Sequence, residues 1–457
     1  MAELNVNIKD TIINLLENKR YSSIKDIFAT MNPSDIASIF DEFTEAQLPV
    51  VFRLLPKELA ADAFAEMETE TQEHLIHSFS DKELKQVIDE LYVDDAVELV
   101  EEMPANVVRR ILSQADADMR RDINLILKYP EDSAGSIMTT EYVSLRPAMT
   151  VSESISHIRA TGVDKETIYT CYVTSNRKLV GLVSVKDLLL AKDNSTKVSE
   201  IMEENVISVD THTDQEEVAK MFSKYNFMAI PVVDSEKRMV GIITFDDVMD
   251  VMEEETTEDL AILSGQTPTD KPYLKSSPFE LFVHRIPWLM ILMVSSTFTG
   301  IIINHFETAL AANIILAAFI PMLMGTGGNS GSQASVTIIR ALSLGEIEFS
   351  DLPRVILKEF ATSALCALAL GLVCFGKLML LDRLLLNNPE LTIDIAFTVS
   401  LALSVTVVLA KILGATLPII AEKLKLDPAV IASPFLTTCV DALCLLVYFG
   451  VATYLLF

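Results

Sequence analysis

Residues 246–263 read DDVMDVMEEETTEDLAIL and place eight carboxylates within about four helical turns. Four of them recur at helical spacing and share one face of a helix: Asp247, Asp250, Glu254 and Glu258. The remaining four widen that face: Asp246, Glu253, Glu255 and Asp259. No Lys or Arg lies between Arg238 and Lys271 to neutralise them. Because like charges one turn apart destabilise a helix, this one needs either surrounding water or bound cations.

Two interpretations of this helix are open, a solvated acidic linker and a cation-responsive connection. A duplicated domain precedes it, and a long apolar region with few polar residues follows it. We favour the second interpretation, because an acidic helix at that junction is well placed to report divalent cations to a membrane domain.

Charged and apolar residues are concentrated in different regions of the chain. The 457 residues carry a formal net charge of −28, yet half of them are hydrophobic. Nearly all the acid lies before Leu281, and long apolar runs follow it. This balance argues against nucleic acid as a partner and favours cations. The sequence shows no metal-protease spacing of histidines and no evident catalytic triad, so an enzyme is the least expected class.

The N-terminal region, residues 1–130, is predicted to be an acidic helical domain. Apolar residues recur at i, i+3 and i+4 around Ile12, Ile36 and Val51, and short turn signals separate the units. Units of roughly 20 to 30 residues suggest a stacked helical superhelix. Asp94, Asp95 and Glu98 cluster within it, and local sequence alone favours an ordinary charged helix face there.

Residues 131–253 contain an internal duplication, with copies near 137–193 and 201–253. The copies open with Ile137-Met138-Thr139 and Ile201-Met202-Glu203, and both close with a Gly-containing strand followed by a helix that carries an acidic residue. First strands are predicted at 142–145 and 206–209. The repeated β-α-β-β-α order resembles a tandem pair of CBS domains. That resemblance implies an adenine nucleotide between the copies, with these residues near it: Asp187 and Asp247 toward the ribose, Tyr169 and Phe227 toward the base.

A linker at 264–280 leads to a predicted membrane domain at 281–457. Five apolar spans are expected near 287–303, 309–339, 361–381, 395–421 and 429–457. Cations flank one set of loops: Lys271, Lys275, Arg285, Arg340, Arg354, Lys358, Lys423 and Lys425. The opposite loops carry Arg383 as their evident cation. The positive-inside rule therefore predicts a multi-pass protein of the plasma (inner) membrane, with its N-terminus in the cytoplasm and its C-terminus outside.

Two polar features lie inside the apolar spans. Asp441 is a costly intramembrane carboxylate, and such residues most often mark ion pathways. Two alternatives are a neutral, protonated Asp441 and a structural pairing with Lys411 of the fourth span. The run GTGGNSGSQ at 325–333 interrupts the second span. Its glycines mean either close helix packing or irregular backbone that lines a cavity. A Mg²⁺ pathway suits these parts, because Mg²⁺ dehydrates reluctantly and needs few direct ligands.

Taken together, the chain resembles the MgtE family of magnesium channels over essentially its whole length. The motifs that carry this resemblance are TDQEEVAKM, PVVD, VGIITFDDVMDV, TTEDL, GTGGNSGSQ and LDPAVIASPF. The family implies a homodimeric, Mg²⁺-selective channel in which the acidic helix, 246–263, is a plug. It implies that cytoplasmic Mg²⁺ closes the pore by binding acidic residues: Asp94, Asp95, Glu98, Glu216, Asp246, Asp247, Asp250, Glu254, Glu255, Glu258 and Asp259. It implies pore ligands at Asp441, Asn329, Ser332 and Gly328.

Three positions depart from the family pattern. Ser332 and Ser433 stand where an Asn is common, and Asn226 stands where Asp occurs. Two other functions stay open at this point. One is a secondary carrier that exchanges Mg²⁺ for Na⁺ or H⁺, and the other is a nucleotide-sensing membrane receptor.

Overall fold

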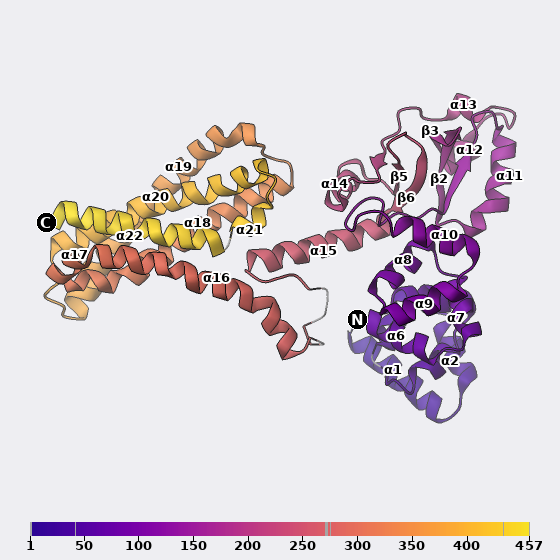
Figure 1. The fold of residues 1–457 in the computed structure, drawn as a ribbon, viewed down its shortest axis with the longest axis horizontal. Coiled ribbons are helices and arrows are strands. Elements are labelled where there is room, and N and C mark those ends of the chain that lie inside the picture. Colours follow the sequence, from indigo (N-terminus) through magenta and orange to yellow (C-terminus); the bar gives the residue numbers. More distant parts are fainter. Residues whose placement is uncertain (1, 42, 270–272, 275, 433, 457) are drawn as a thin grey trace. The chain divides into compact units, whose positions relative to one another are not determined.

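The computed structural model describes residues 2–41, 43–269, 273–274, 276–432 and 434–456. The chain divides into two compact units, Met1–Met252 and Glu253–Phe457, each drawn in Figure 1. One core of the first unit joins the N-terminal helices to the second half of the duplication, and a smaller core fills the first half. The second unit has cores of its own between long apolar helices.

The N-terminal part of the first unit is a stack of helices whose apolar stripes face inward. Ile12, Ile36 and Val51 are fully buried, as their spacing predicts. Ser80 caps one helix by accepting a hydrogen bond from the Glu83 backbone, and the Glu83 carboxylate accepts one in return. The bounds are α1 Ala2–Glu17, α2 Tyr21–Phe28, α3 Pro33–Phe40, α4 Leu48–Phe52, α5 Lys57–Ala65, α6 Thr69–Ser78, α7 Asp81–Ile88, α8 Val93–Glu102, α9 Ala105–Gln114 and α10 Ala117–Ile126.

Phenylalanine rings link successive helices of this stack. The Phe52 ring of α4 lies 6.2 Å from Phe40 of α3 and 6.2 Å from Phe64 of α5, centroid to centroid. It also lies 5.1 Å from Phe79, which follows α6. Aromatic pairs at these distances add about 1 kcal/mol each beyond simple burial. One continuous aromatic core therefore holds these successive helices together.

The duplicated part forms two three-stranded sheets, ordered β1-β2-β3 and β4-β5-β6. In each sheet the first pair of strands is parallel and the second antiparallel. The first copy contains β1 Tyr142–Leu145, α11 Val151–Thr161, η1 Gly162–Asp164, β2 Thr167–Ser175, β3 Lys178–Ser184 and α12 Val185–Leu190. The second contains α13 Val198–Ile201, β4 Val209–Asp210, α14 Gln215–Tyr225, β5 Ala229–Val233, β6 Met239–Thr244 and α15 Phe245–Leu263.

Each copy begins on the sheet of the other. Thr139 exchanges two backbone hydrogen bonds with Ile242 of β6, at 2.8 and 2.9 Å. Glu203 exchanges two with Leu182 of β3, at 2.8 and 3.0 Å. This crossed pairing explains the repeated Ile-Met opening, because the side chains of Met138 and Met202 lie over the glycine of the opposite copy.

The first strand of the second copy is shorter than predicted. Residues 206–208 are not in a strand, and β4 holds only Val209–Asp210. The preceding residue Glu203 is already paired with β3 of the first copy, so the chain must cross to its own sheet before it can pair there.

The second unit consists mainly of long apolar helices. Within the described residues, five stretches are long and apolar enough to cross a membrane, namely Pro278–His305, Ile314–Ser343, Phe349–Leu385, Ile393–Lys423 and Phe435–Leu456. The helices are α16 Pro278–His305, α17 Glu307–Ala312, η2 Ile314–Phe319, α18 Ile320–Ser343, η3 Phe349–Asp351, α19 Leu352–Lys377, the π-helix η4 Leu378–Leu385, α20 Ile393–Lys423, α21 Pro428–Ala432 and α22 Pro434–Leu456. The predicted fold class is confirmed: an N-terminal helical domain, a CBS pair and five apolar spans.

The glycine-rich run of α18 packs helices closely and does not break the backbone. The helix is continuous from Ile320 to Ser343. A methyl group on Gly331 would stand 3.2 Å from Val440 of α22 and 3.3 Å from the Ala410 carbonyl oxygen of α20. Of the two interpretations of these glycines, close packing is the one observed.

Candidate functional site

The first candidate site lies where α8 meets the start of α15 in the first unit. Asp94 and Asp95 are in the first turn of α8. Asp246 and Asp247 are in the first turn of α15. The carboxylate of Asp247 accepts hydrogen bonds from the backbone amide and the hydroxyl of Thr244, at 3.2 and 2.5 Å, which fixes it at the helix start. Figure 1 shows α8 beside this end of α15.

These carboxylates hold protons more tightly than exposed acids do. Burial, and then the charge of Asp247, raise the pKa of Asp95 to about 7. Burial raises the pKa of Asp94 well above its usual range, with added repulsion from Asp247 and Asp95. Burial also raises the pKa of Asp247 to about 6, although the Thr244 hydrogen bonds oppose it. A cation that enters such a cluster replaces protons and relieves repulsion.

Two glutamates that the sequence reasoning missed belong to the same cluster. Burial and the charges of Asp247 and Asp95 raise the pKa of Glu166 to about 8, and one of its carboxylate oxygens is buried without a hydrogen-bond partner. Glu141 accepts a hydrogen bond from the Val93 backbone amide at 3.1 Å and so caps α8. Neither residue lies in an acidic run, so no local signal in the sequence could have found them.

The spacing of the cluster bears on the kind of cation that fits it. Among the residues that the structure describes, no three His, Cys, Asp or Glu side chains are grouped closely enough to hold a bare metal ion. A cation that keeps part of its water shell, as Mg²⁺ does, suits a wider arrangement of carboxylates. Carboxylate oxygens are among the ligands that Mg²⁺ accepts, directly or through its own waters.

The other predicted sensor residues lie at several places. Glu98 is exposed on α8, and Asp250 follows on α15 with its charge adding to that on Asp247. Glu216 begins α14 and forms an ion pair with Lys220 at 2.8 Å. The remaining acidic residues lie on the part of α15 that belongs to the second unit: Glu254, Glu255, Glu258 and Asp259.

Two of the predicted nucleotide residues, Asp187 and Asp247, occupy equivalent places in the two copies. Ser184 donates a hydrogen bond to Asp187 at the start of α12, as Thr244 does to Asp247 at the start of α15. Tyr169 is 72% exposed and available to a ligand. The Phe227 ring stacks on Tyr225, with centroids 5.4 Å apart.

Asn226, where the family can carry Asp, ends α14. Its backbone is left-handed with φ of +55°, and its backbone N–H donates a hydrogen bond to the Phe222 carbonyl oxygen at 2.8 Å. Asn is one of the few residues that adopt this conformation readily, so the position has a local structural role.

In the second unit, two of the predicted pore residues share one cavity. Asn329 and Ser332 line a space of about 850 Å³ between α18, α19 and α20. Gly328 lies on the neighbouring face of α18, where a methyl group would stand 3.7 Å from Thr437 of α22. Asp441 follows Thr437 by four residues and so lies on the same face of α22. The second Asn-to-Ser departure, Ser433, lies outside the described residues.

Among the described residues, Lys411 does not lie beside Asp441 as an ion-pair partner, which is one of the alternatives that the sequence leaves open. It lines the same 850 Å³ cavity and is 7% exposed. Within the described ranges it forms no ion pair with Asp441. The structural alternative of an Asp441–Lys411 pair is therefore not what the structure shows.

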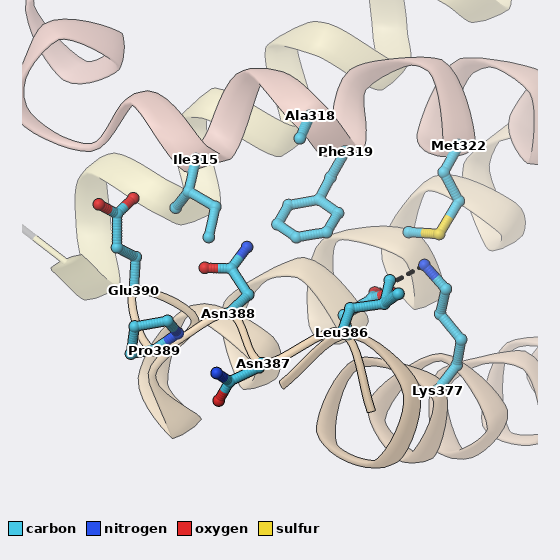
Figure 2. Close-up of a pocket in the computed structure, with 11 residues that line it drawn as sticks. Ile315, Ala318, Phe319, Met322, Lys377, Leu386, Asn387, Asn388, Pro389 and Glu390 are labelled. Atoms are coloured by element: carbon cyan, nitrogen blue, oxygen red, sulfur yellow. Dashed lines mark hydrogen bonds and ion pairs between the residues drawn. The ribbon is translucent and has the colours of Figure 1, made fainter. Parts of the chain in front are cut away.

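A second cavity of about 500 Å³ lies where η4 and the loop after it approach η2 and α18 (Figure 2). Ile315, Phe319 and Met322 form its apolar side, and Asn388 and Glu390 lie at its polar side. In the same cavity Lys377 forms an ion pair with Asp382 at 2.7 Å, drawn as the dashed line in Figure 2. The charge of Lys377 is thus neutralised by Asp382, five residues later in the chain.

Three family models match successive parts of the chain. The family described as MgtE, divalent cation transporter, matches residues 320–451. The MgtE intracellular N domain matches residues 31–132, and the CBS domain matches 134–194 and 198–254.

Comparison with individual proteins gives the same result. The chain is 36% identical over 438 residues to a magnesium transporter MgtE of Thermus thermophilus, covering 95% of each chain. It is 34% identical over 445 residues to one of Bacillus subtilis, covering 97% of this chain and 96% of the relative.

One solved structure, the cytosolic domain of the Mg²⁺ channel MgtE in complex with ATP, is 35% identical with a TM-score of 0.51. It covers 53% of this chain and 99% of its own. Another, the soluble part of a magnesium transporter, is 28% identical with a TM-score of 0.52, covering 55% and 99%. By full-length sequence similarity and by the order of its domains, this chain belongs to the MgtE family of divalent cation transporters.

Proposed function

We propose that the protein is a homodimeric, Mg²⁺-selective channel that takes up magnesium and closes when cytoplasmic Mg²⁺ is plentiful. Its support in the structure is the group of half-buried carboxylates, Asp94, Asp95 and Asp247, which repel one another across two helices. Relatives named magnesium transporters, similar over the full length, support Mg²⁺ as the cargo.

The sensor works by a shift in equilibrium. Without Mg²⁺, repulsion between α8 and α15 disfavours their close approach, because charges in a poorly solvated place interact strongly. Mg²⁺ bound between the helices removes that repulsion and favours the compact state. Mg²⁺ must bind the closed state better than the open state, and the difference in binding free energy sets the extent of closure. The acidic side chains farther along α15 extend the sensor: Glu254, Glu255, Glu258 and Asp259.

The pore is proposed to use Asp441, with Asn329, Ser332 and Gly328 on α18. Two copies of Asp441 in a homodimer supply negative charge on both sides of a two-fold axis. The amide and hydroxyl oxygens of Asn329 and Ser332 accept hydrogen bonds from the waters of a hydrated ion. The excess of Lys and Arg in one set of loops supports an N-terminus in the cytoplasm and a C-terminus outside the plasma membrane.

The CBS pair is proposed to bind ATP or another adenine nucleotide. A relative of the cytosolic part was solved with ATP. Asp187 and Asp247 are the acceptors for ribose hydroxyls, and Tyr169 and Phe227 lie toward the base. Asp247 would then serve both the nucleotide and the Mg²⁺ sensor, so the two ligands are coupled through one carboxylate.

One experiment tests the channel. The full-length protein and Asp441→Ala are reconstituted in lipid bilayers, and Mg²⁺ current is recorded while cytoplasmic Mg²⁺ is raised. We expect unitary currents that shut as Mg²⁺ rises and that fall sharply in Asp441→Ala. Slow, gradient-coupled flux without unitary steps would support a carrier coupled to Na⁺ or H⁺, and absence of flux would support a nucleotide-sensing receptor.

A second measurement tests the sensor. Replacing Asp247 and Glu258 by Ala is expected to weaken Mg²⁺-dependent closure while conduction persists. Unchanged closure in the double variant would overturn the sensor assignment and leave the pore assignment in place.

A further inference from the structure

The 850 Å³ cavity of the second unit brings two opposite charges to one wall. Lys411 of α20 and Glu359 of α19 both line it. The other polar lining residues are neutral hydrogen-bonding groups: Asn329, Ser332, Gln333, Thr337 and Thr362. Because Asn329 and Ser332 are proposed pore residues, the contents of this cavity bear on the movement of cations.

Neither charge is satisfied by a neighbouring side chain. In the part of the chain that the structure describes, Lys411 has no ion pair and no hydrogen bond, although it is only 7% exposed. One carboxylate oxygen of Glu359 is buried with no hydrogen-bond partner. Lys377, by contrast, pairs with Asp382 at 2.7 Å in the other cavity. Charged groups shielded from water without a partner are unfavourable, so we expect water or other polar groups in the Lys411–Glu359 cavity.

The size and the donor set of the cavity fit a hydrated cation. Six waters around one ion occupy roughly 180 Å³ at about 30 Å³ per water, well below the available space. Carboxylate, amide and hydroxyl oxygens all accept hydrogen bonds from such waters. An anion would suit Lys411 but would be repelled by Glu359, whereas a cation meets Glu359 and can displace a mobile ammonium.

We propose that this cavity is a cation compartment in which Glu359 attracts the hydrated divalent ion and Lys411 is a tethered counter-cation. This inference rests on the proposed transport function and adds to it two residues that determine selectivity. The lysine side chain is long and flexible, so its ammonium can shift within the cavity when an ion enters. A divalent ion competes with the ammonium better than a monovalent ion does, because Coulomb attraction to Glu359 doubles with charge.

The test is a set of charge changes in the full-length protein, measured as Mg²⁺ and Na⁺ uptake into liposomes. Lys411→Met leaves Glu359 without a competitor. We expect half-maximal Mg²⁺ uptake at a concentration lower by on the order of tenfold, together with new Na⁺ uptake. Glu359→Gln removes the negative charge from the cavity and leaves the Lys411 ammonium as its only charged group. Mg²⁺ uptake should therefore fall by on the order of tenfold. The double variant restores the net charge and should return both readouts toward wild type.

Two controls separate charge from folding. Lys411→Arg keeps the positive charge and should retain exclusion of Na⁺. Lys358→Met removes an exposed cation next to Glu359 that does not line the cavity, and uptake should not change. Thermal unfolding of each purified variant shows whether it folds.

The outcomes distinguish this inference from the proposed function. If wild type carries Mg²⁺ and the folded Lys411→Met variant gains no Na⁺ uptake, or the double variant fails to restore uptake, the compartment is wrong and the channel stands. If wild type carries no Mg²⁺ at all, the proposed function fails and this inference fails with it.

Discussion

Gly414 of α20 lies directly against Gly331 of α18, and the Gly331 carbonyl oxygen occupies the space that a methyl group on Gly414 would need. The Gly331 Cα would stand 3.1 Å from that methyl group. Both obstacles are backbone atoms, so no side-chain rotation can relieve the overlap. This contact brings the backbones of α18 and α20 close together.

Gly414→Ala is therefore expected to destabilise the membrane unit by about 3 kcal/mol, as overpacking of a rigid contact does. Thermal unfolding of the purified protein in detergent measures this change. Gly376→Ala is the matched control, because a methyl group there meets no atom within 4 Å and the site is also helical. The control should be neutral or stabilising by about 0.5 kcal/mol, and equal losses in the two variants would contradict the backbone contact.

The two equivalent glycines of the CBS copies are expected to respond differently to alanine. A methyl group on Gly241 would stand 2.6 Å from the Thr139 carbonyl oxygen, which is backbone. The closest atom to one on Gly181 is the sulfur of the flexible Met202 side chain, at 2.8 Å. Gly241→Ala should lower the unfolding free energy by about 2 kcal/mol, and Gly181→Ala by less.

Calorimetry of the two single variants measures the difference between these glycines. Adding Met138→Ala to Gly241→Ala should not restore stability, because the backbone oxygen remains. Rescue by that second change would show that the Met138 side chain is the true obstacle.

Glu166 makes the stability of the first unit depend on pH. Its pKa rises from an ordinary 4.5 to about 8 in the folded protein. Between these values the folded state holds a proton that the unfolded state has lost, so stability falls as pH rises through this window. Glu166→Gln removes that proton uptake, and it should raise stability at pH 8 and flatten its pH dependence.

The measurement for Glu166 is thermal unfolding of wild type and Glu166→Gln across pH 5 to 9 in EDTA. Mg²⁺ should replace the proton in wild type and flatten its curve as well. A wild-type stability that rises with pH across this range would contradict the assignment.

Asp95→Asn is expected to weaken cytoplasmic Mg²⁺ binding by on the order of tenfold, because it removes one of the charges that face the cation. Calorimetric titration of the full-length protein with Mg²⁺ gives the affinity. Asp35→Asn is the control, since Asp35 is an exposed acid in the first turn of α3. Equal loss of affinity in both variants would mean that Mg²⁺ responds to overall charge and not to this cluster.

Much of the architecture was predictable because its signals are local. Five spans follow from the length of apolar runs, and the CBS pair follows from a motif that appears twice in register. The acidic face of α15 follows from helical spacing alone, since residues three and four apart must meet. Asp441 could be picked out because a carboxylate inside an apolar span is costly and therefore most often has a function.

What the sequence by itself determined, then, is the order of the domains and the face on which each charge lies. Only the tertiary structure placed Glu166 beside Asp95 and Asp247, and Glu359 in one cavity with Lys411, because residues from different helices are brought together by packing. It also decided that the glycines of α18 pack a continuous helix, and that β4 is short because Glu203 is already bound to the other sheet. Periodicity is a property of neighbours in sequence, whereas burial, and therefore the energy of every buried charge, depends on what the rest of the chain places around it.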